Sequence, residues 1–205
     1  MNRRKYIQTT ATALGAGITS TLLTTSTDRR TLKIHIYTHD KKYPENTRYI
    51  KQYIKKFYSD IQENYSIQVI IQEPVTLPQT ALESTYHAIT EWANSTYTEY
   101  TRHETDPSNK TDIALLLFSK EETNWNNYIG RANTGTPYAV SHGAKLIQEI
   151  SYYPNLILHE TGHCLGLKHS HSTQYRDNTH SLMHPYINNT ITQYSTTSKK
   201  RIQDI

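Results

Sequence analysis

The residues best suited to chemistry lie in the stretch 155–169, which reads NLILHETGHCLGLKH. His159 and His163 are four residues apart in an apolar, helix-like context, so both imidazoles project from one helix face, one turn apart. Gly166 follows three residues later and can adopt a positive φ, which ends the helix and turns the chain back. His169 then reaches the same ion. The spacing predicts one metal site with three histidine ligands.

Three neutral imidazoles leave a tetrahedral zinc ion one open position, which is typical of a catalytic rather than a structural zinc. Glu160 follows the first ligand directly, where its carboxylate can take a proton from the attacking water and pass it to the leaving amine. The sequence therefore predicts one catalytic Zn²⁺ bound by His159, His163 and His169. Glu160 is the expected catalytic residue, acting as general base and then as general acid.

The stretch 159–169 resembles the metzincin clan of zinc metalloproteases, whose H-E-x-x-H-x-x-G-x-x-H motif is matched at every fixed position. That clan also has a methionine turn after the third histidine, and SLMHP (181–185) is similar to it. The resemblance implies that Met183 lies beneath the zinc as a hydrophobic support. It also implies that Pro185 and Tyr186 form part of the wall of the substrate pocket after the scissile bond.

Within the clan, Ser170 and the LMHPY turn are similar to those of matrixins. The terminal stretch YSTTSKKRIQ (194–203) is also matrixin-like, because a serine-capped helix ends the catalytic domain of that family, and Ser195 is the expected N-cap here. Thr197 and Ser198 depart from the acidic pair usual in that helix. The resemblance predicts a matrixin-like metzincin.

Some features are similar to adamalysins instead. A helix expected from about residue 79 to 100, with Leu82, Tyr86 and Ile89 on its core-facing stripe, resembles the adamalysin arrangement. The disulfides of that family are impossible, because Cys164 is the only cysteine, and Cys164 itself is expected to be a small buried apolar residue.

The elements that position these residues follow from hydropathy patterning. Alternating or continuous apolar runs predict strands, and a 3.6-residue period predicts helices. Besides the helix from 79 to 100, we expect strands at 31–37, 66–72 and 113–118, two short strands within 130–143, an amphipathic helix at 47–65 and a further helix opened by Pro154. The fold class is α/β, and the resemblance implies a metzincin-type twisted mixed β-sheet with long helices, an active-site helix and a small C-terminal subdomain ending in a helix.

The first 27 residues are expected to be a twin-arginine-type signal segment, because the basic pair Arg3-Arg4 precedes a weakly apolar, Thr-rich stretch. Residues 11–25 are too short and too polar to span a bilayer, so stable membrane insertion after export is not expected. The sequence thus predicts a secreted protein of prokaryotic type, with a catalytic domain at 28–205.

The formal charge of +4 comes from scattered Lys and Arg residues, without a basic stripe interleaved with aromatic residues. Nucleic acid is therefore not an expected partner. Eight histidines outside the motif lack acidic partners at ligand spacing and are expected to be ordinary surface or core residues, with His171 and His180 near the rim of the site: His35, His39, His87, His103, His142, His171, His180 and His184.

These expectations describe a monomeric, secreted zinc endopeptidase that hydrolyses peptide bonds by zinc-activated water with Glu160 as general base. In related enzymes the protein or peptide substrate binds in extended form along an edge strand, and residues 130–133 are the expected strand. The alternative is a non-proteolytic, zinc-containing interaction module on a metzincin scaffold. Glu160 favours the enzyme, because a structural zinc site needs no carboxylate beside an open position.

Overall fold

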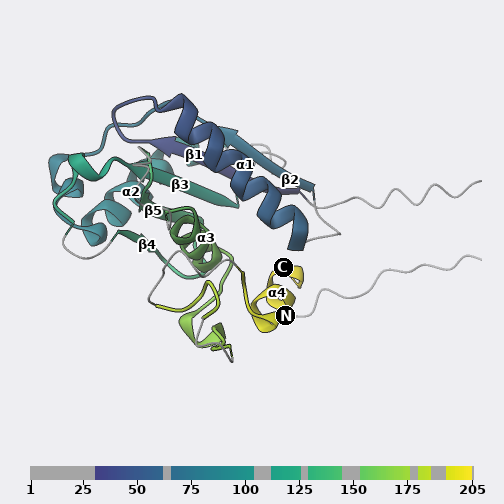
Figure 1. Ribbon diagram of the computed structural model, residues 1–205. Coiled ribbons are helices and arrows are strands. Elements are labelled where there is room, and N and C mark those ends of the chain that lie inside the picture. Colours follow the sequence, from purple (N-terminus) through teal and green to yellow (C-terminus); the bar gives the residue numbers. More distant parts are fainter. Residues whose placement is uncertain are drawn as a thin grey trace, which may run out of the picture.

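The structure is a computed structural model, and it describes residues 31–61, 66–103, 112–125, 129–144, 153–175, 180–185 and 193–204. The expected signal segment lies outside these residues. A mixed sheet is covered by helices on both faces. In the view of Figure 1, the chain that follows helix α3 (Tyr153–Cys164) lies below the sheet.

The sheet has five strands in the order β2-β1-β3-β5-β4. The four strands β1 (Thr31–Thr38), β2 (Ser66–Ile71), β3 (Ile113–Phe118) and β5 (Tyr138–His142) run parallel. The edge strand β4 (Gly130–Ala132) pairs antiparallel with β5. All the predicted strands are confirmed, and β3 is buried along its whole length, as its continuous apolar run IALLLF requires of a central strand.

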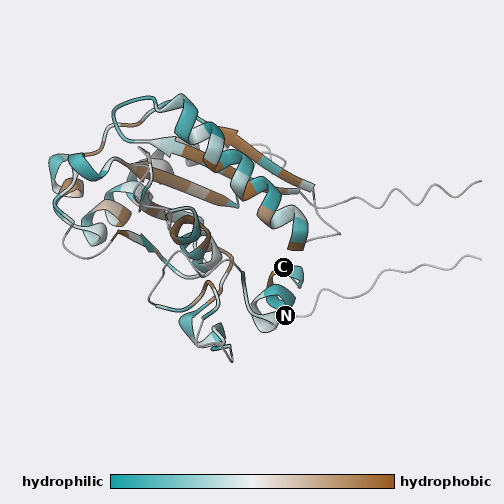
Figure 2. Ribbon diagram, viewed as in Figure 1, coloured by the Kyte–Doolittle hydropathy of each residue, from teal (hydrophilic) through white to brown (hydrophobic). Residues whose placement is uncertain are grey.

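Helices α1 (Pro44–Ile61) and α3 (Tyr153–Cys164) pack on one face of the sheet. Their apolar side chains meet alternate residues of β1 and β3, such as Ile34 and Leu115. Figure 2 shows the same division, with hydrophobic residues on the strands and hydrophilic residues on the outer face of α1. Helix α1 begins at Pro44, before the predicted start, because proline is tolerated in the first turn, where the backbone N–H has no helical partner.

The opposite face carries the 3₁₀ helix η1 (Gln79–Leu82) and helix α2 (Thr85–His103). The single helix predicted from 79 to 100 is therefore wrong in one respect. The helical structure is interrupted after Glu83, because the Ser84 hydroxyl accepts a hydrogen bond from the His87 N–H and so starts a new helix. Tyr86 was expected in the core but is 63% exposed.

The C-terminal part contains the 3₁₀ helix η4 (His169–His171) and helix α4 (Thr196–Gln203). Ser195 caps α4 as predicted, since its hydroxyl accepts the Ser198 N–H at 3.1 Å. This layout confirms the predicted α/β fold class, with a mixed sheet, long helices and a small C-terminal part that ends in a helix. Within the described ranges, no helix combines the length and the apolar character that a membrane crossing takes.

Candidate metal centre

Helix α3 presents His159 and His163 from one face, one turn apart. Gly166 ends this helical region with a φ of +81°, and the turn brings His169 back to the same place. The three Nε2 atoms form a nearly equilateral triangle: His163 lies 3.1 Å from His159 and 3.2 Å from His169, and His169 lies 3.2 Å from His159. The structure thus brings the three predicted ligands together.

The tautomers of two of these rings follow from their other nitrogen. Nδ1 of His159 faces the Leu182 carbonyl oxygen, and Nδ1 of His163 lies 2.8 Å from the Leu167 carbonyl oxygen. A carbonyl only accepts, so each Nδ1 carries the proton and each Nε2 presents a lone pair. Lone pairs facing one another at 3.1 Å repel unless a cation lies between them.

A zinc ion fits this donor set. Zinc–nitrogen bonds of about 2.0–2.1 Å in a tetrahedron place their nitrogens about 3.3 Å apart, close to the triangle seen here. Burial lowers the pKa of all three rings, in the case of His159 to about 3, with the neighbouring histidines lowering it further against the opposing hydrogen bond to Leu182. At neutral pH the imidazoles are therefore neutral and ready to bind a metal. Within the described residues, this triad is the group of side chains that could hold an ion.

Glu160 is buried, and its carboxylate accepts a hydrogen bond from the Ala132 N–H of β4. Burial raises its pKa to about 8, while the Arg131 charge and the Ala132 N–H act in the opposite direction. A Cβ atom at Gly130 would come within 3.0 Å of the Glu160 Cγ and Oε1 atoms. The absence of a side chain at residue 130 thus leaves the space that Glu160 occupies.

The methionine turn lies against α3. Met183 is fully buried, and a Cβ atom at Gly162 would come within 2.9 Å of the Met183 sulfur and 2.6 Å of the Tyr194 hydroxyl. Met183 therefore packs on the backbone between the two helical ligands, and its role as a hydrophobic support beneath a zinc ion stays a prediction. The backbone of the same turn holds His159 through the Leu182 carbonyl.

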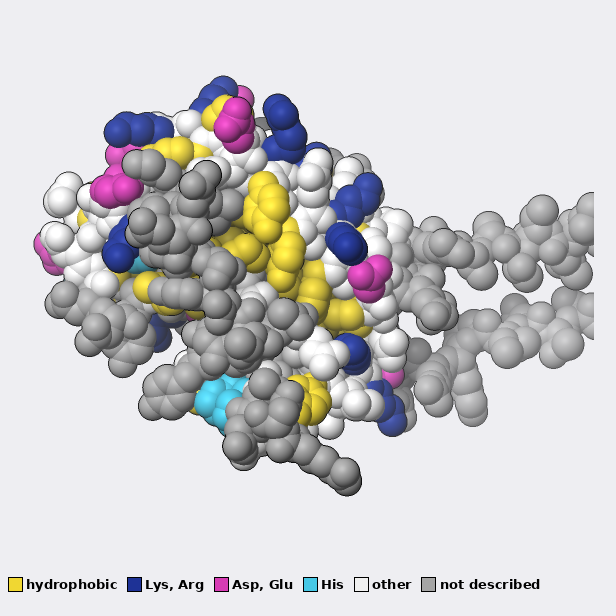
Figure 3. Space-filling model, viewed as in Figure 1, with side chains coloured by type: hydrophobic (Ala, Val, Ile, Leu, Met, Phe, Trp, Pro, Cys, Tyr) yellow, Lys and Arg dark blue, Asp and Glu magenta, His cyan; other side chains and the backbone are white. Residues whose placement is uncertain are grey.

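Pro185 is exposed at the end of this turn, whereas Tyr186 lies outside the described residues, so the pocket-wall roles stay predictions. His180 and His184 stack with ring centroids 3.7 Å apart. The charge of His184 lowers the pKa of His169, which places it near the site. Figure 3 shows histidine side chains gathered at the surface beside the segment that follows α3.

Several contributors escaped the sequence analysis. The carbonyls of Leu167 and Leu182, the Ala132 N–H and the Tyr194 hydroxyl act through the backbone or through packing. Residue type and spacing carry no signal for such contacts. Cys164 is buried, as predicted.

Comparison with known proteins points the same way. A family model described as "Astacin", a family of peptidases, matches residues 39–205, well over half of the chain. No curated protein matches closely enough to count as a relative. Among solved structures, the crystal structure of archaemetzincin from Methanopyrus kandleri superposes with a TM-score of 0.57 at 14% sequence identity, covering 89% of this chain and 98% of that chain.

At 14% identity the structural likeness concerns the fold alone. The family match goes further and supports a zinc-dependent metallopeptidase of the metzincin clan, as the motif predicted. The finer matrixin-like assignment stays a prediction, because the matching model describes another family. With residues 39–205 matched, this chain belongs to the astacin family of peptidases.

Proposed function

We propose that this protein is a secreted zinc endopeptidase with one catalytic ion held by His159, His163 and His169. The observation that carries the proposal is the triangle of three Nε2 atoms 3.1–3.2 Å apart. A buried glutamate, Glu160, directly follows His159 in the chain. A metal bound there supplies Lewis-acid polarisation of a carbonyl and acidifies water. The neutral rings supply the nitrogen lone pairs.

Glu160 is the proposed general base. Its carboxylate is desolvated and fixed by the Ala132 N–H, so it meets a water proton in one orientation. Burial favours its protonated form in the metal-free protein, whereas a nearby cation favours the carboxylate. The same group can then return the proton to the leaving amine.

The edge strand β4 is the proposed site for an extended peptide. The His142 N–H donates to the Ile129 carbonyl at 2.8 Å, and these residues continue the register that places Gly130 opposite Ser141. Because bonded pairs alternate along an antiparallel ladder, the backbone groups of Gly130 and Ala132 point away from β5. The Ala132 N–H on that outward edge contacts Glu160, so the edge lies beside the proposed general base. This position supports binding of a substrate strand along the edge by strand addition.

The remaining features of the proposal rest on sequence patterns. Export rests on the Arg3-Arg4 signal pattern, and the lack of nucleic-acid partners rests on the scattered charge. The lack of stable membrane insertion rests on the short, polar stretch 11–25, and a monomeric state is proposed with it. Pro185 and Tyr186 are proposed for the pocket wall. The matrixin-like features are proposed for the terminal helix, where the Ser195 cap supports them.

The test measures cleavage of casein and of an internally quenched peptide by wild type, Glu160→Ala and chelator-treated protein. We expect wild-type cleavage at internal bonds, loss of activity with the chelator, recovery with zinc, and little activity in the variant at equal zinc content. Cleavage that survives either treatment would overturn the mechanism. Inactive wild-type protein with bound zinc would favour the non-proteolytic module.

A further inference from the structure

The three candidate ligands are not held alike. His159 and His163 each have Nδ1 against a backbone carbonyl, which fixes the ring. Nδ1 of His169 makes no hydrogen bond to another residue that the structure describes, and His169 is the exposed member of the triad. The direction of its ring therefore depends on the backbone of η4.

The far end of η4 is clamped by two serine hydroxyls. The His171 carbonyl accepts a hydrogen bond from Ser195 Oγ at 2.6 Å and another from Ser198 Oγ at 3.1 Å. Both serines are buried, with 1% and 0% of their surface exposed. They come from the start of α4, 24 and 27 residues further along the chain. One carbonyl is thus fixed by two donors that are themselves buried.

The clamp is stiff at both ends. The Ser195 hydroxyl also accepts the Ser198 N–H as the N-cap of α4, so both its donor and an acceptor position are used. On the other side, the Ser172 N–H donates to the His169 carbonyl and the His171 N–H to the Lys168 carbonyl, each at 2.9 Å. His169 and His171 therefore belong to one hydrogen-bonded turn, and fixing one end orients the other.

The two residues before Ser195 reach the rest of the centre. The Gln193 carbonyl accepts the Leu182 N–H at 2.9 Å, and the Leu182 carbonyl in turn holds His159. The Tyr194 hydroxyl donates to the Leu158 carbonyl, one residue before the first ligand. Consecutive residues of one segment thus contact the supports of all the ligand-bearing elements.

We propose that Ser195 and Ser198 are positioning residues for the metal centre, because they hold the His171 carbonyl and with it the turn that presents His169. This inference rests on the metal site of the proposed function but not on proteolysis. Groups that orient metal ligands from behind typically contribute about 10–100-fold to metal affinity. The paired hydroxyls are therefore expected to show in zinc binding itself.

The experiment measures the zinc dissociation constant of the full chain by competition with a chromophoric chelator, and the visible spectrum of the cobalt-substituted protein. The variants are Ser195→Ala, Ser198→Ala, the double variant and the conservative Ser195→Thr. Ser119→Ala is the matched control, because Ser119 is also a buried N-cap serine, at the 3₁₀ helix Lys120–Glu122 away from the triad. Thermal unfolding of each metal-free variant monitors the fold.

We expect zinc binding about 10–100-fold weaker in the double variant, with a changed cobalt spectrum. The Ser198→Ala variant keeps the cap oxygen and should lose severalfold in affinity even if the double variant fails to fold. Ser195→Thr keeps a hydroxyl and should return the affinity to near the wild-type value, and Ser119→Ala should leave it unchanged.

Folded alanine variants with wild-type zinc affinity and spectrum would overturn the inference while leaving the proposed function intact. An equal loss in Ser119→Ala would also overturn it, since the effect would then be general destabilisation. Wild-type protein that binds zinc but cleaves no peptide would overturn the proposed peptidase alone.

Discussion

Within the described residues, histidines are buried in two regions, and only one of these regions arranges the rings around a point. In the metal centre, three Nε2 atoms lie within 3.2 Å of one another. In the second region, on the α2 side of the sheet, the His142 ring stacks on Trp125 with centroids 4.7 Å apart, and the His39 ring stacks on Phe118 at 4.9 Å. We call this second region the stacked cluster, consisting of His39, Phe118, Trp125 and His142.

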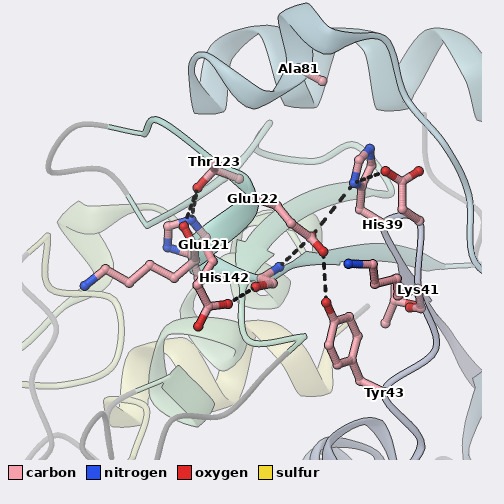
Figure 4. A network of polar contacts seen from close by, with 12 residues as sticks. His39, Lys41, Tyr43, Ala81, Glu121, Glu122, Thr123 and His142 are labelled. Carbon is pink, nitrogen blue, oxygen red and sulfur yellow. Dashed lines mark hydrogen bonds and ion pairs between the residues drawn. The ribbon is translucent and has the colours of Figure 1, made fainter.

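One nitrogen of each histidine in the stacked cluster faces a polar group, and the two nitrogens face different groups (Figure 4). His142 Nε2 lies 2.7 Å from the Thr123 hydroxyl, whereas His39 Nδ1 lies 3.4 Å from an Asp40 oxygen and 3.9 Å from a Glu122 oxygen. The Glu122 carboxylate also accepts the Tyr43 hydroxyl at 2.9 Å. Burial of histidines is therefore not what makes a metal site. A metal site requires that the nitrogen lone pairs meet at one point. In the metal centre this results from the spacing of the histidines on a helix and from the backbone carbonyls that fix their tautomers.

The largest expected effect breaks this comparison at the ligands. His163→Ala removes one of three nitrogen donors and should weaken zinc binding by more than about 100-fold, beyond what loss of a supporting contact costs. His142→Gln, a buried histidine of the stacked cluster, should leave zinc affinity unchanged. Isothermal titration of zinc into both variants measures the difference, and equal losses would remove the distinction between the two regions.

A smaller effect is expected where the methionine turn meets α3. Gly162→Ala gains about 1 kcal/mol of helix propensity, but its Cβ meets Tyr194 and Met183, and such overpacking costs about 1–3 kcal/mol. The free energy of unfolding should therefore fall by up to about 2 kcal/mol, and zinc affinity should fall with it. Urea unfolding measures the first quantity. Thr90→Ala, at an exposed position of α2, is the control and should not destabilise the protein.

The stacked cluster should respond to acid without any metal. Burial, and secondarily the Lys120 charge, lower the pKa of His142 to about 4. Between about pH 6.5 and pH 4, the unfolded chain therefore binds a proton at this histidine that the folded chain does not bind. The stabilisation is complete above about pH 6.5 and is lost as the pH falls toward about 4, by at most about 1.4 kcal/mol per pH unit. Urea unfolding of zinc-free wild type and His142→Gln should show the shallower pH dependence in the variant. Parallel curves would contradict this assignment.

The smallest expected effect lies at the rim of the same region. Tyr43→Phe removes the hydrogen bond that the Tyr43 hydroxyl donates to the partly exposed Glu122 carboxylate. The variant should lose about 1 kcal/mol of unfolding free energy. Zinc binding and peptide cleavage should stay at wild-type values. A change in zinc affinity would show that the two regions are coupled through the sheet.

The sequence predicted the triad because its geometry is local. Two histidines four residues apart share a helix face, and Gly166 turns the chain within one further step. The strands were equally predictable, since IALLLF has the length and composition of a central strand. These features depend on neighbours within a few residues.

Most supports of the site could not be predicted, because they join residues that are distant in the chain. His159 and Leu182 are 23 residues apart, and Ser195 and His171 are 24 apart. The interruption before α2 was missed for a related reason. The Trp125 indole N–H donates a hydrogen bond to the Ala81 carbonyl, and the Asn124 N–H donates one to the Leu82 carbonyl. Hydropathy periodicity carries no information on such partners.

The most direct test of the central claim is anomalous diffraction at the zinc edge from crystals of the zinc-loaded chain. The account predicts one zinc ion per chain within about 2.0–2.1 Å of Nε2 of His159, His163 and His169. It also predicts no zinc at the stacked cluster. A zinc peak bound by His39 or His142 instead, or one that lacks any of the three predicted nitrogens, would contradict it.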